Sequence, residues 1–176
     1  FQTPVFVVSD LDLGMNDWMV PKLRWDDGYR PDRGKVLSEA ELSQIDRFYR
    51  YLDRDGDGIA ARTLPGVHPK GAYFTRGSGH NELGGYTEDP AEYQKVMDRL
   101  ARKIDGAAEV LPAPAVQLRE GARWGMISIG GCDAAVREAL DRLDAAGLPL
   151  DYLRVRGFPF AQSVTEFLHA HPWSYV

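Results

Sequence analysis

The chain has 176 residues, of which 44% are hydrophobic, and its formal net charge is −5. This is ordinary for a globular protein of one large or two small domains. The acidic balance argues against a nucleic-acid partner, because contacts to phosphates need a basic face. The single cysteine, Cys132, excludes a disulfide framework and a cysteine-ligated metal site within this chain, and it fits a reducing, cytoplasmic setting. No apolar run approaches the roughly 20 residues of a membrane-spanning helix, so no membrane contact is expected.

The first predicted element is a strand. Residues 5–8 form a short apolar, β-branched run, which is typical of a parallel strand buried on both faces. Residues 9–37 are broken by proline and glycine and predict a long loop. Asp10, Asp12 and Asn16 follow the strand at its carboxyl end, where parallel sheets bind ligands. They are candidate interface or cofactor-binding residues.

A helix is predicted next. Ser38 and Glu41 form a capping box, which marks a helix start. Apolar residues then recur at spacings of three and four, which predicts a helix that reaches the acidic loop at 53–58. This stripe is Leu42, Ile45, Tyr49 and Leu52.

The acidic loop places Asp53, Asp55 and Asp57 at alternate positions before Gly58. The pattern matches the first half of a calcium-binding EF-hand loop. The twelfth position holds Leu64 instead of a bidentate glutamate, so an EF-hand is not expected. Two interpretations of this loop remain. It could bind a structural Ca²⁺ or Mg²⁺ that a distant carboxylate completes, or it could be a solvated turn, which is the favoured interpretation.

A glycine-rich loop follows, with glycines at 77, 79, 84 and 85. Their spacing is not that of a dinucleotide-binding fingerprint. His80 could serve as a proton donor or an oxyanion partner near neutral pH. The alternative is a surface histidine in a flexible loop.

A second helix is predicted after Asp89, a plausible N-cap, with Pro90 at its first position. Its predicted buried face is apolar, and residues 112–114 then read as a linker, with a domain boundary at 112–116. The apolar face is Tyr93, Met97, Leu100 and Ile104.

The remainder alternates between strands and helices, which predicts a parallel βαβαβ sheet with right-handed crossovers. Gly147 is expected just past the end of the first of these helices. Strand-like runs close to both ends of the sequence suggest a piece cut from a longer polypeptide. The predicted elements are strand 124–129, helix 133–146, strand 150–155, helix 163–171 and strand 173–176.

The turn at 130–133 lies at the carboxyl end of a predicted strand, where helix N-termini attract anions. Tight-turn geometry is the favoured alternative. Cys132 has no base nearby in sequence and is not expected to be a nucleophile. His169 and His171 are expected to interact with a helix dipole rather than to bind metal.

Several of these segments together resemble the α subunit of 2-oxoacid:ferredoxin oxidoreductases of the 2-oxoglutarate type. The resemblance runs over essentially the whole chain, and the stretch 9–89 is the specific part. The segments are SDLDLGMNDWMVPKLRWDDGYRPDRGKVL, DGDGI, RTLPGVHPKGAYFTRGSGHNELGGYTED, MISIGGCDAAVREALDRL and LDYLRVRGFPF.

The resemblance implies an α/β fold. Residues 1–112 would be the C-terminal part of the pyrimidine-binding domain of a thiamine-diphosphate fold, with long loops. Residues 116–176 would be a transketolase C-terminal-like domain with a parallel βαβαβ sheet, incomplete here.

The resemblance also implies an activity. Such an enzyme decarboxylates a 2-oxoacid on thiamine diphosphate and Mg²⁺, passes the acyl group to coenzyme A, and reduces ferredoxin. Its cofactor is bound mainly outside these residues, the iron–sulfur clusters lie in partner regions, and a β subunit is required. The chain alone is therefore expected to be inactive.

Few functional residues carry over from the resemblance, and none is assignable as catalytic. The loop with Arg76, Ser78, His80 and Asn81 is expected near the active site, and the acidic loop is expected to be structural. Two alternatives remain: a Ca²⁺-binding interaction module that uses the acidic loop, and a flavodoxin-like binder that uses the turn at 130–133.

Overall fold

The computed structural model describes residues 1–75 and 77–176. Contacts group them into two compact units: residues 1–5 with 24–106, and residues 6–23 with 107–176. This grouping does not test the expected assignment to a pyrimidine-binding and a transketolase C-terminal-like domain, which stays a prediction. Among the described residues, no helix is both long enough and apolar enough to span a membrane.

The first unit begins its regular structure at the helix α2, Glu39–Ser43. The predicted capping box is confirmed, because Ser38 and Glu41 each bond the other's backbone amide. The predicted extension to residue 52 is wrong, and the helix has five residues. The Lys70 ammonium bonds the carbonyl oxygens of Ser43 and Ile45, 3.2 and 2.7 Å away. It thereby satisfies groups that helix propagation would otherwise use.

The long helix α3, Pro90–Asp105, begins as predicted, with the Asp89 side chain accepting from the amide of Ala91. A short 3-10 turn, Gly106–Glu109, follows it. The buried face of α3 differs from the prediction. It consists of Val96, Arg99 and Lys103, whereas the predicted face is largely exposed.

Polar contacts explain why a different face of α3 is buried. The Arg99 guanidinium donates to the carbonyl of Gly58 at 2.8 Å, and the Lys103 ammonium donates to the carbonyl of Phe1 at 3.0 Å. Two backbone acceptors from distant segments therefore select the inward face of α3. A second 3-10 turn, Pro69–Gly71, lies in the same unit.

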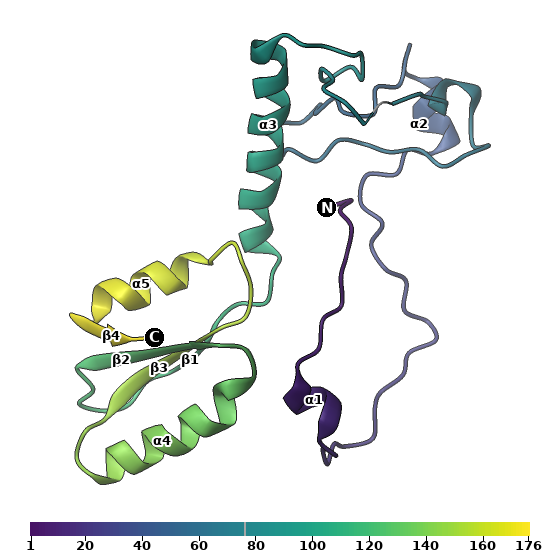
Figure 1. Ribbon diagram of the computed structural model, residues 1–176. Coiled ribbons are helices and arrows are strands. Elements are labelled where there is room, and N and C mark those ends of the chain that lie inside the picture. Colours follow the sequence, from purple (N-terminus) through teal and green to yellow (C-terminus); the bar gives the residue numbers. More distant parts are fainter. Residues whose placement is uncertain (76) are drawn as a thin grey trace. The chain divides into compact units, whose positions relative to one another are not determined.

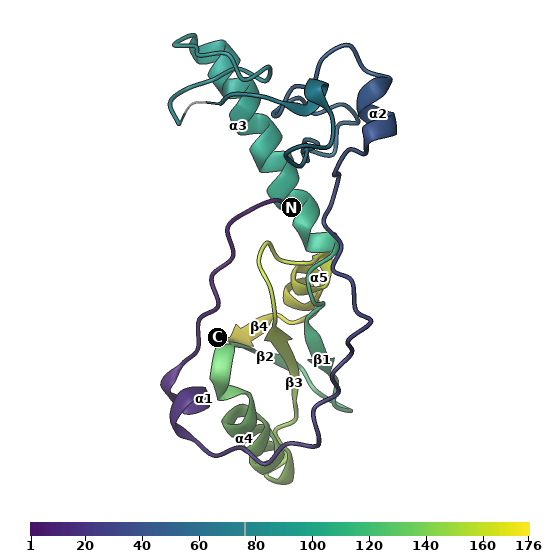
Figure 2. The same cartoon turned by 90° about the vertical axis from the view of Figure 1, so that its right-hand side faces the viewer.

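The N-terminal strand prediction is wrong in this structure. Residues 5–8 are extended but unpaired in the described part of the chain, and Val7 is 95% exposed. A strand buried on both faces needs neighbouring strands, and no other described strand pairs with this segment. The following loop contains one short helix, α1, Leu11–Met15, and is otherwise largely extended chain (Figure 2).

The second unit contains a four-stranded sheet in the order β1-β3-β2-β4. The strand β2 pairs in parallel with both β3 and β4, which confirms the predicted parallel core of an α/β fold. A short edge strand, β1, pairs antiparallel with β3 and was not predicted. The strands are β1 Ala115–Gln117, β2 Trp124–Ile129, β3 Leu150–Val155 and β4 Trp173–Tyr175.

Two helices cover opposite faces of this sheet (Figure 1). They are α4, Asp133–Ala145, preceded by a 3-10 turn at Gly130–Cys132, and α5, Gln162–Ala170. Alternate strand residues face each helix, as the period of a strand requires. Ile127, Leu153 and Val155 pack with Val164 and Phe167 of α5, and Leu140 of α4 packs with Leu150 and Tyr152.

Candidate functional site

The acidic loop is held together by its own backbone. One carboxylate oxygen of Asp53 accepts from the amide of Gly56 at 3.0 Å, and the other accepts from the amide of Gly58 at 2.9 Å. The Arg102 guanidinium approaches the second oxygen to 3.3 Å. Asp53 is therefore satisfied by donors from the loop and from α3.

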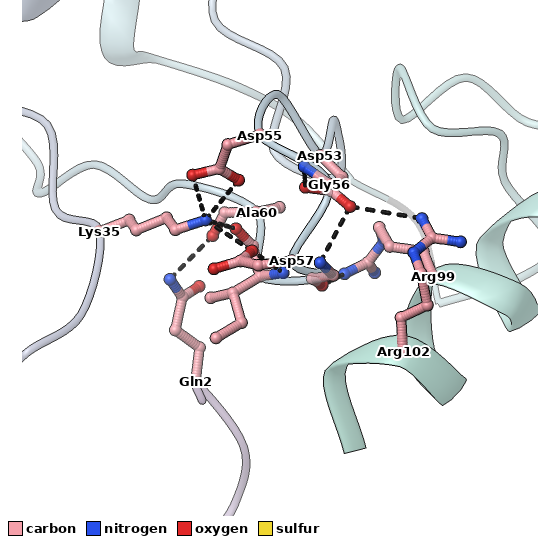
Figure 3. A network of polar contacts seen from close by, with 11 residues as sticks. Gln2, Lys35, Asp53, Asp55, Gly56, Asp57, Ala60, Arg99 and Arg102 are labelled. Carbon is pink, nitrogen blue, oxygen red and sulfur yellow. Dashed lines mark hydrogen bonds and ion pairs between the residues drawn. The ribbon is translucent and has the colours of Figure 1, made fainter. Parts of the chain in front are cut away.

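The other two aspartates share one cation, the ammonium of Lys35 (Figure 3). Its Nζ lies 2.6 and 2.8 Å from the carboxylate oxygens of Asp55 and 2.6 Å from Oδ1 of Asp57. The carbonyl oxygen of Ile59 is 2.9 Å away. Four oxygens thus converge on a side chain that precedes the loop by about twenty residues.

The pKa values agree with this pairing. Burial acts to lower the pKa of Lys35, but hydrogen bonds and charge from Asp55 and Asp57 outweigh it and raise that pKa. The hydrogen bond from Lys35 is the main reason that the pKa of Asp57 is lowered. For Asp53, burial acts to raise the pKa, and the amides of Gly58 and Gly56 with Arg102 lower it overall.

The glycine-rich loop is shaped by Asn81. Its side-chain oxygen accepts from the backbone amides of Leu83 and Gly85 at 3.1 and 2.9 Å. Its backbone amide donates to the carbonyl of Gly85 at 2.9 Å. Of the other candidates in this loop, Ser78 is exposed, and Arg76 lies outside the described residues. Asn81 therefore stabilises the conformation of the loop.

His80 is half-buried and held from two sides. Its ring stacks on Tyr51, with centroids 3.8 Å apart and planes 13° from parallel. Its Nδ1 is 3.0 Å from the carbonyl oxygen of Asn81, so Nδ1 carries the proton in this contact. The ring is consequently fixed, and no hydrogen bond to its Nε2 is found within residues 1–75 and 77–176.

The two loops meet at one depression over α3, with a volume of about 280 Å³. Asp53 and Gly56 line it from the acidic loop, and Glu82 lines it from the glycine-rich loop. The sequence places Glu82 beside His80 and Asn81 in the glycine-rich loop, but no motif assigns it a role. The residues that α3 contributes are Lys95, Val96, Asp98, Arg99 and Arg102.

In the second unit, Asp10 caps α1 by accepting from the amide of Leu13 at 2.8 Å. The amide side chain of Asn16 donates to Asp12. A Cβ on Gly131 would lie 3.0 Å from a carboxylate oxygen of Asp10, so Asp10 faces the turn after β2. The structure thus brings one of the 10–16 candidates to the turn at 130–133.

That turn already holds an anion, the carboxylate of Asp133. Tyr152 donates to it at 2.8 Å and is itself 2.6 Å from the hydroxyl of Ser128. The hydrogen bond from Arg137, followed by that from Tyr152, lowers the pKa of Asp133. Arg137 and Arg154 pair with the same carboxylate at 3.1 and 3.4 Å. The polar groups of this turn are thus bonded within the chain, and the flavodoxin-like alternative stays an untested prediction.

The remaining candidates are structural. The Sγ atom of Cys132 is exposed and donates weakly to the carbonyl of Ile129 at 3.5 Å. His171 is buried, with Nδ1 2.7 Å from the carbonyl of Phe167 in the last turn of α5 and Nε2 2.9 Å from Asp151. His171 therefore contacts the helix end, as expected, while His169 is exposed.

The described residues do not fit a Mg²⁺–diphosphate group. Asp53, Asp55 and Asp57 form the one group of three metal-ligand side chains found among them, with ligand atoms within 4.8 Å of one another. Lys35 supplies the positive charge for that group. No catalytic step through thiamine diphosphate follows from these residues, and the alternative of a Ca²⁺-binding module is not supported.

Comparisons with known proteins find the same family that the sequence motifs resemble. No family model matches the chain. A curated relative, subunit alpha of 2-oxoacid:ferredoxin oxidoreductase 2 from Aeropyrum pernix, is 28% identical over 171 residues. The match covers 94% of this chain and 25% of the relative, so the chain spans about a quarter of the relative's length.

Among solved structures, the chain is similar to the 2-oxoglutarate:ferredoxin oxidoreductase from Magnetococcus marinus, determined with 2-oxoglutarate, coenzyme A and succinyl-CoA bound. The TM-score is 0.65 at 24% identity, with 74% of this chain and 23% of that chain covered. At this identity the likeness shows the fold alone. Together the two comparisons confirm the resemblance that the sequence motifs indicated.

Proposed function

We propose that this chain is part of the α subunit of a 2-oxoacid:ferredoxin oxidoreductase. The observation that carries the proposal is the similarity to such a subunit along 94% of the chain, across both compact units. A similarity confined to the parallel sheet would be much weaker support, because that architecture serves many unrelated functions.

The proposed reaction is the oxidative decarboxylation of 2-oxoglutarate. The C1–C2 bond breaks and releases CO₂, the acyl group passes to the thiol of coenzyme A, and two electrons leave singly to ferredoxin. Thiamine diphosphate with Mg²⁺ would supply the carbanion stabilisation, and iron–sulfur clusters in partner regions would carry the electrons. The choice of 2-oxoglutarate is supported by the substrate named for the Magnetococcus marinus protein.

Within this proposal, the chain positions loops and contacts a β subunit, while other residues hold the cofactor. The assignments of 1–112 to a pyrimidine-binding domain and of 116–176 to a transketolase C-terminal-like domain belong to the same proposal. We assign His80 the active-site role in this loop, because stacking on Tyr51 and the Nδ1 contact with Asn81 fix its ring.

The test uses the full-length α subunit co-expressed with its β subunit. We expect reduction of ferredoxin, or of a viologen dye, that depends on both 2-oxoglutarate and coenzyme A, with pyruvate and other 2-oxoacids as comparison substrates. If no 2-oxoacid supports reduction by an intact, cofactor-loaded complex, the proposed function is wrong.

A second arm tests the glycine-rich loop. The His80→Gln variant should lower kcat by about tenfold or more and change its pH profile, because a fixed imidazole near the reaction would be lost. His68→Gln is the matched control, since the Nδ1 of His68 accepts from the amide of Lys70 in a separate turn of the same unit. Unchanged turnover in His80→Gln would remove the loop from the active site without affecting the assignment of the complex.

A further inference from the structure

We propose that the Lys35 ammonium serves as the built-in cation of the acidic loop, so that the loop needs no metal, and that removing this charge opens a site for a divalent cation. The proposal concerns the cation that holds residues 53–59 in shape. It is independent of the activity proposed above.

The oxygens around Lys35 are those that a calcium loop would offer. In an EF-hand, positions 3 and 5 supply carboxylates and position 7 supplies a backbone carbonyl. Here those positions are Asp55, Asp57 and Ile59, and their oxygens lie 2.6–2.9 Å from the Lys35 nitrogen. Ammonium–oxygen contacts of this length are charge-assisted hydrogen bonds.

The first position of the pattern has been diverted. Both carboxylate oxygens of Asp53 accept from loop amides, and one also receives Arg102 from α3. An aspartate that accepts from the amides of its own loop stabilises the turn of the backbone. Asp53 therefore has a structural role in this loop. The loop therefore keeps the fold of a cation-binding turn while its charge is neutralised from within.

Lys35 is delivered to the loop by backbone pairing. Its carbonyl accepts from the amide of Arg62, and the carbonyl of Arg62 accepts from the amide of Leu37, both at 2.9 Å. These bonds fix residues 35–37 beside the segment that leaves the loop. A monovalent cation tied to the chain is present at every metal concentration, so the loop would be insensitive to Ca²⁺.

Space for a replacement cation exists beside the ammonium. A depression of about 430 Å³ is lined by Lys35, Asp55 and Ile59, among other residues of this unit. Loss of the lysine charge would leave the carboxylate of Asp55, which lines this opening, within 4.8 Å of the carboxylate of Asp57. Two carboxylates and a carbonyl, completed by water, are the oxygen ligands that Ca²⁺ prefers.

The test compares the full chain, wild type and Lys35→Met, by amide hydrogen exchange of the 53–60 segment with and without millimolar Ca²⁺. In the variant without Ca²⁺, exchange should be faster by about tenfold or more, because charge-assisted bonds are lost and like charges remain. Ca²⁺ should reverse most of this acceleration, whereas the wild type should not respond.

Lys70→Met is the matched control, since the Lys70 ammonium bonds only carbonyl oxygens among the contacts described for it, those of Ser43 and Ile45. Its exchange should show no Ca²⁺ response. Adding Asp55→Asn to Lys35→Met should abolish the response of that variant.

Two results would overturn the proposal. One is Ca²⁺ binding by the wild type at micromolar concentrations, measured by calorimetry, since a filled site should not bind. The other is a folded Lys35→Met variant whose 53–60 segment exchanges at the wild-type rate. The wild-type measurement stands even if Lys35→Met fails to fold, and Lys35→Gln provides a second neutral variant.

Discussion

Gly58 is a point of close approach between the acidic loop and α3. Its φ is +84°, and a Cβ there would lie 2.5 Å from the amide nitrogen of Lys103 and 2.7 Å from the carbonyl oxygen of Arg99. Both are helix backbone atoms that cannot yield. Gly58→Ala should therefore lower the free energy of unfolding in urea by about 3 kcal/mol or more, through combined strain and overlap.

Gly56→Ala is the control for this substitution. Gly56 has the same φ of +84°, but a Cβ added there would meet no atom within 4 Å. The left-handed conformation alone should cost about 1–2 kcal/mol. Equal losses in the two variants would contradict close packing of the loop on α3.

The carboxyl groups of the acidic loop predict a dependence of stability on pH. The pKa values of Asp53 and Asp57 are lowered from the usual 3.8 in the folded chain. Their stabilising contribution is therefore complete above that usual value and is lost as the pH falls through the lower, folded-state pKa. The pKa of Lys35 is raised above 10.5, so its contribution is complete below that value and is lost as the pH rises through the folded-state pKa.

Hydrogen exchange of residues 53–60 should thus be independent of these groups between about pH 5 and 9, after correction for intrinsic rates, and should accelerate below about pH 4. Asp57→Asn should weaken the acid transition, because one of the two titrating groups is removed. Asp46→Asn, at an exposed position in the same unit, is the control. A transition of the same size in Asp57→Asn and the wild type would show that other groups control it.

At the scale of single residues, the sequence predicts those contacts that join residues close together in the chain. The caps at Ser38 and Asp89 and the acidic turn are predictable because each needs residues only a few positions away. Lys35 is not predictable as the partner of Asp55 and Asp57, because backbone pairing with Arg62 brings it there. No spacing rule in the sequence encodes that meeting.

At the scale of elements, local periodicity predicts the strands and helices of residues 124–176 well and the first unit poorly. The strands β2 and β3 and the helix α4 follow from alternation and from the 3.6-residue period, which tertiary contacts reinforce there. In the first unit, long-range polar contacts override the pattern: Lys70 meets the end of α2, and Arg99 and Lys103 turn α3 away from its apolar stripe.

The packing of α5 on the sheet depends on a glycine in β2. A Cβ on Gly125 would lie 2.6 Å from a ring carbon of Phe167 and 3.2 Å from His171. Gly125→Ala should lower the free energy of unfolding by about 1–3 kcal/mol, because the core face would be overpacked. Chemical denaturation measures the loss.

A second substitution separates overpacking from other causes. Phe167→Leu removes the ring that meets the new methyl group, so the double variant Gly125→Ala/Phe167→Leu should lose less stability than the two single losses added together. Strict additivity would contradict a direct clash between residue 125 and α5.

At the scale of the whole molecule, the N-terminal segment leaves a run of large apolar side chains open to solvent. Phe6, Val7 and Val8 are 85–95% exposed, and large apolar side chains continue to Trp25. Contiguous apolar patches of this kind mark surfaces that other protein covers. The sequence indicates a buried strand at 5–8, and the described residues supply nothing to bury it.

The proposed complex gives this segment a partner, and that leads to a test on the assembled protein. The amides of residues 5–8 should exchange at least about tenfold more slowly in the αβ complex than in the chain alone, because burial and pairing would protect them. Val7→Asp should weaken assembly, measured by the fraction of α that co-purifies with β, since a buried unpaired charge is costly. Leu118→Asp, at an exposed position 70% open to solvent, is the matched control. Equal exchange in the two states would mean that the apolar segment is not an assembly surface for the β subunit.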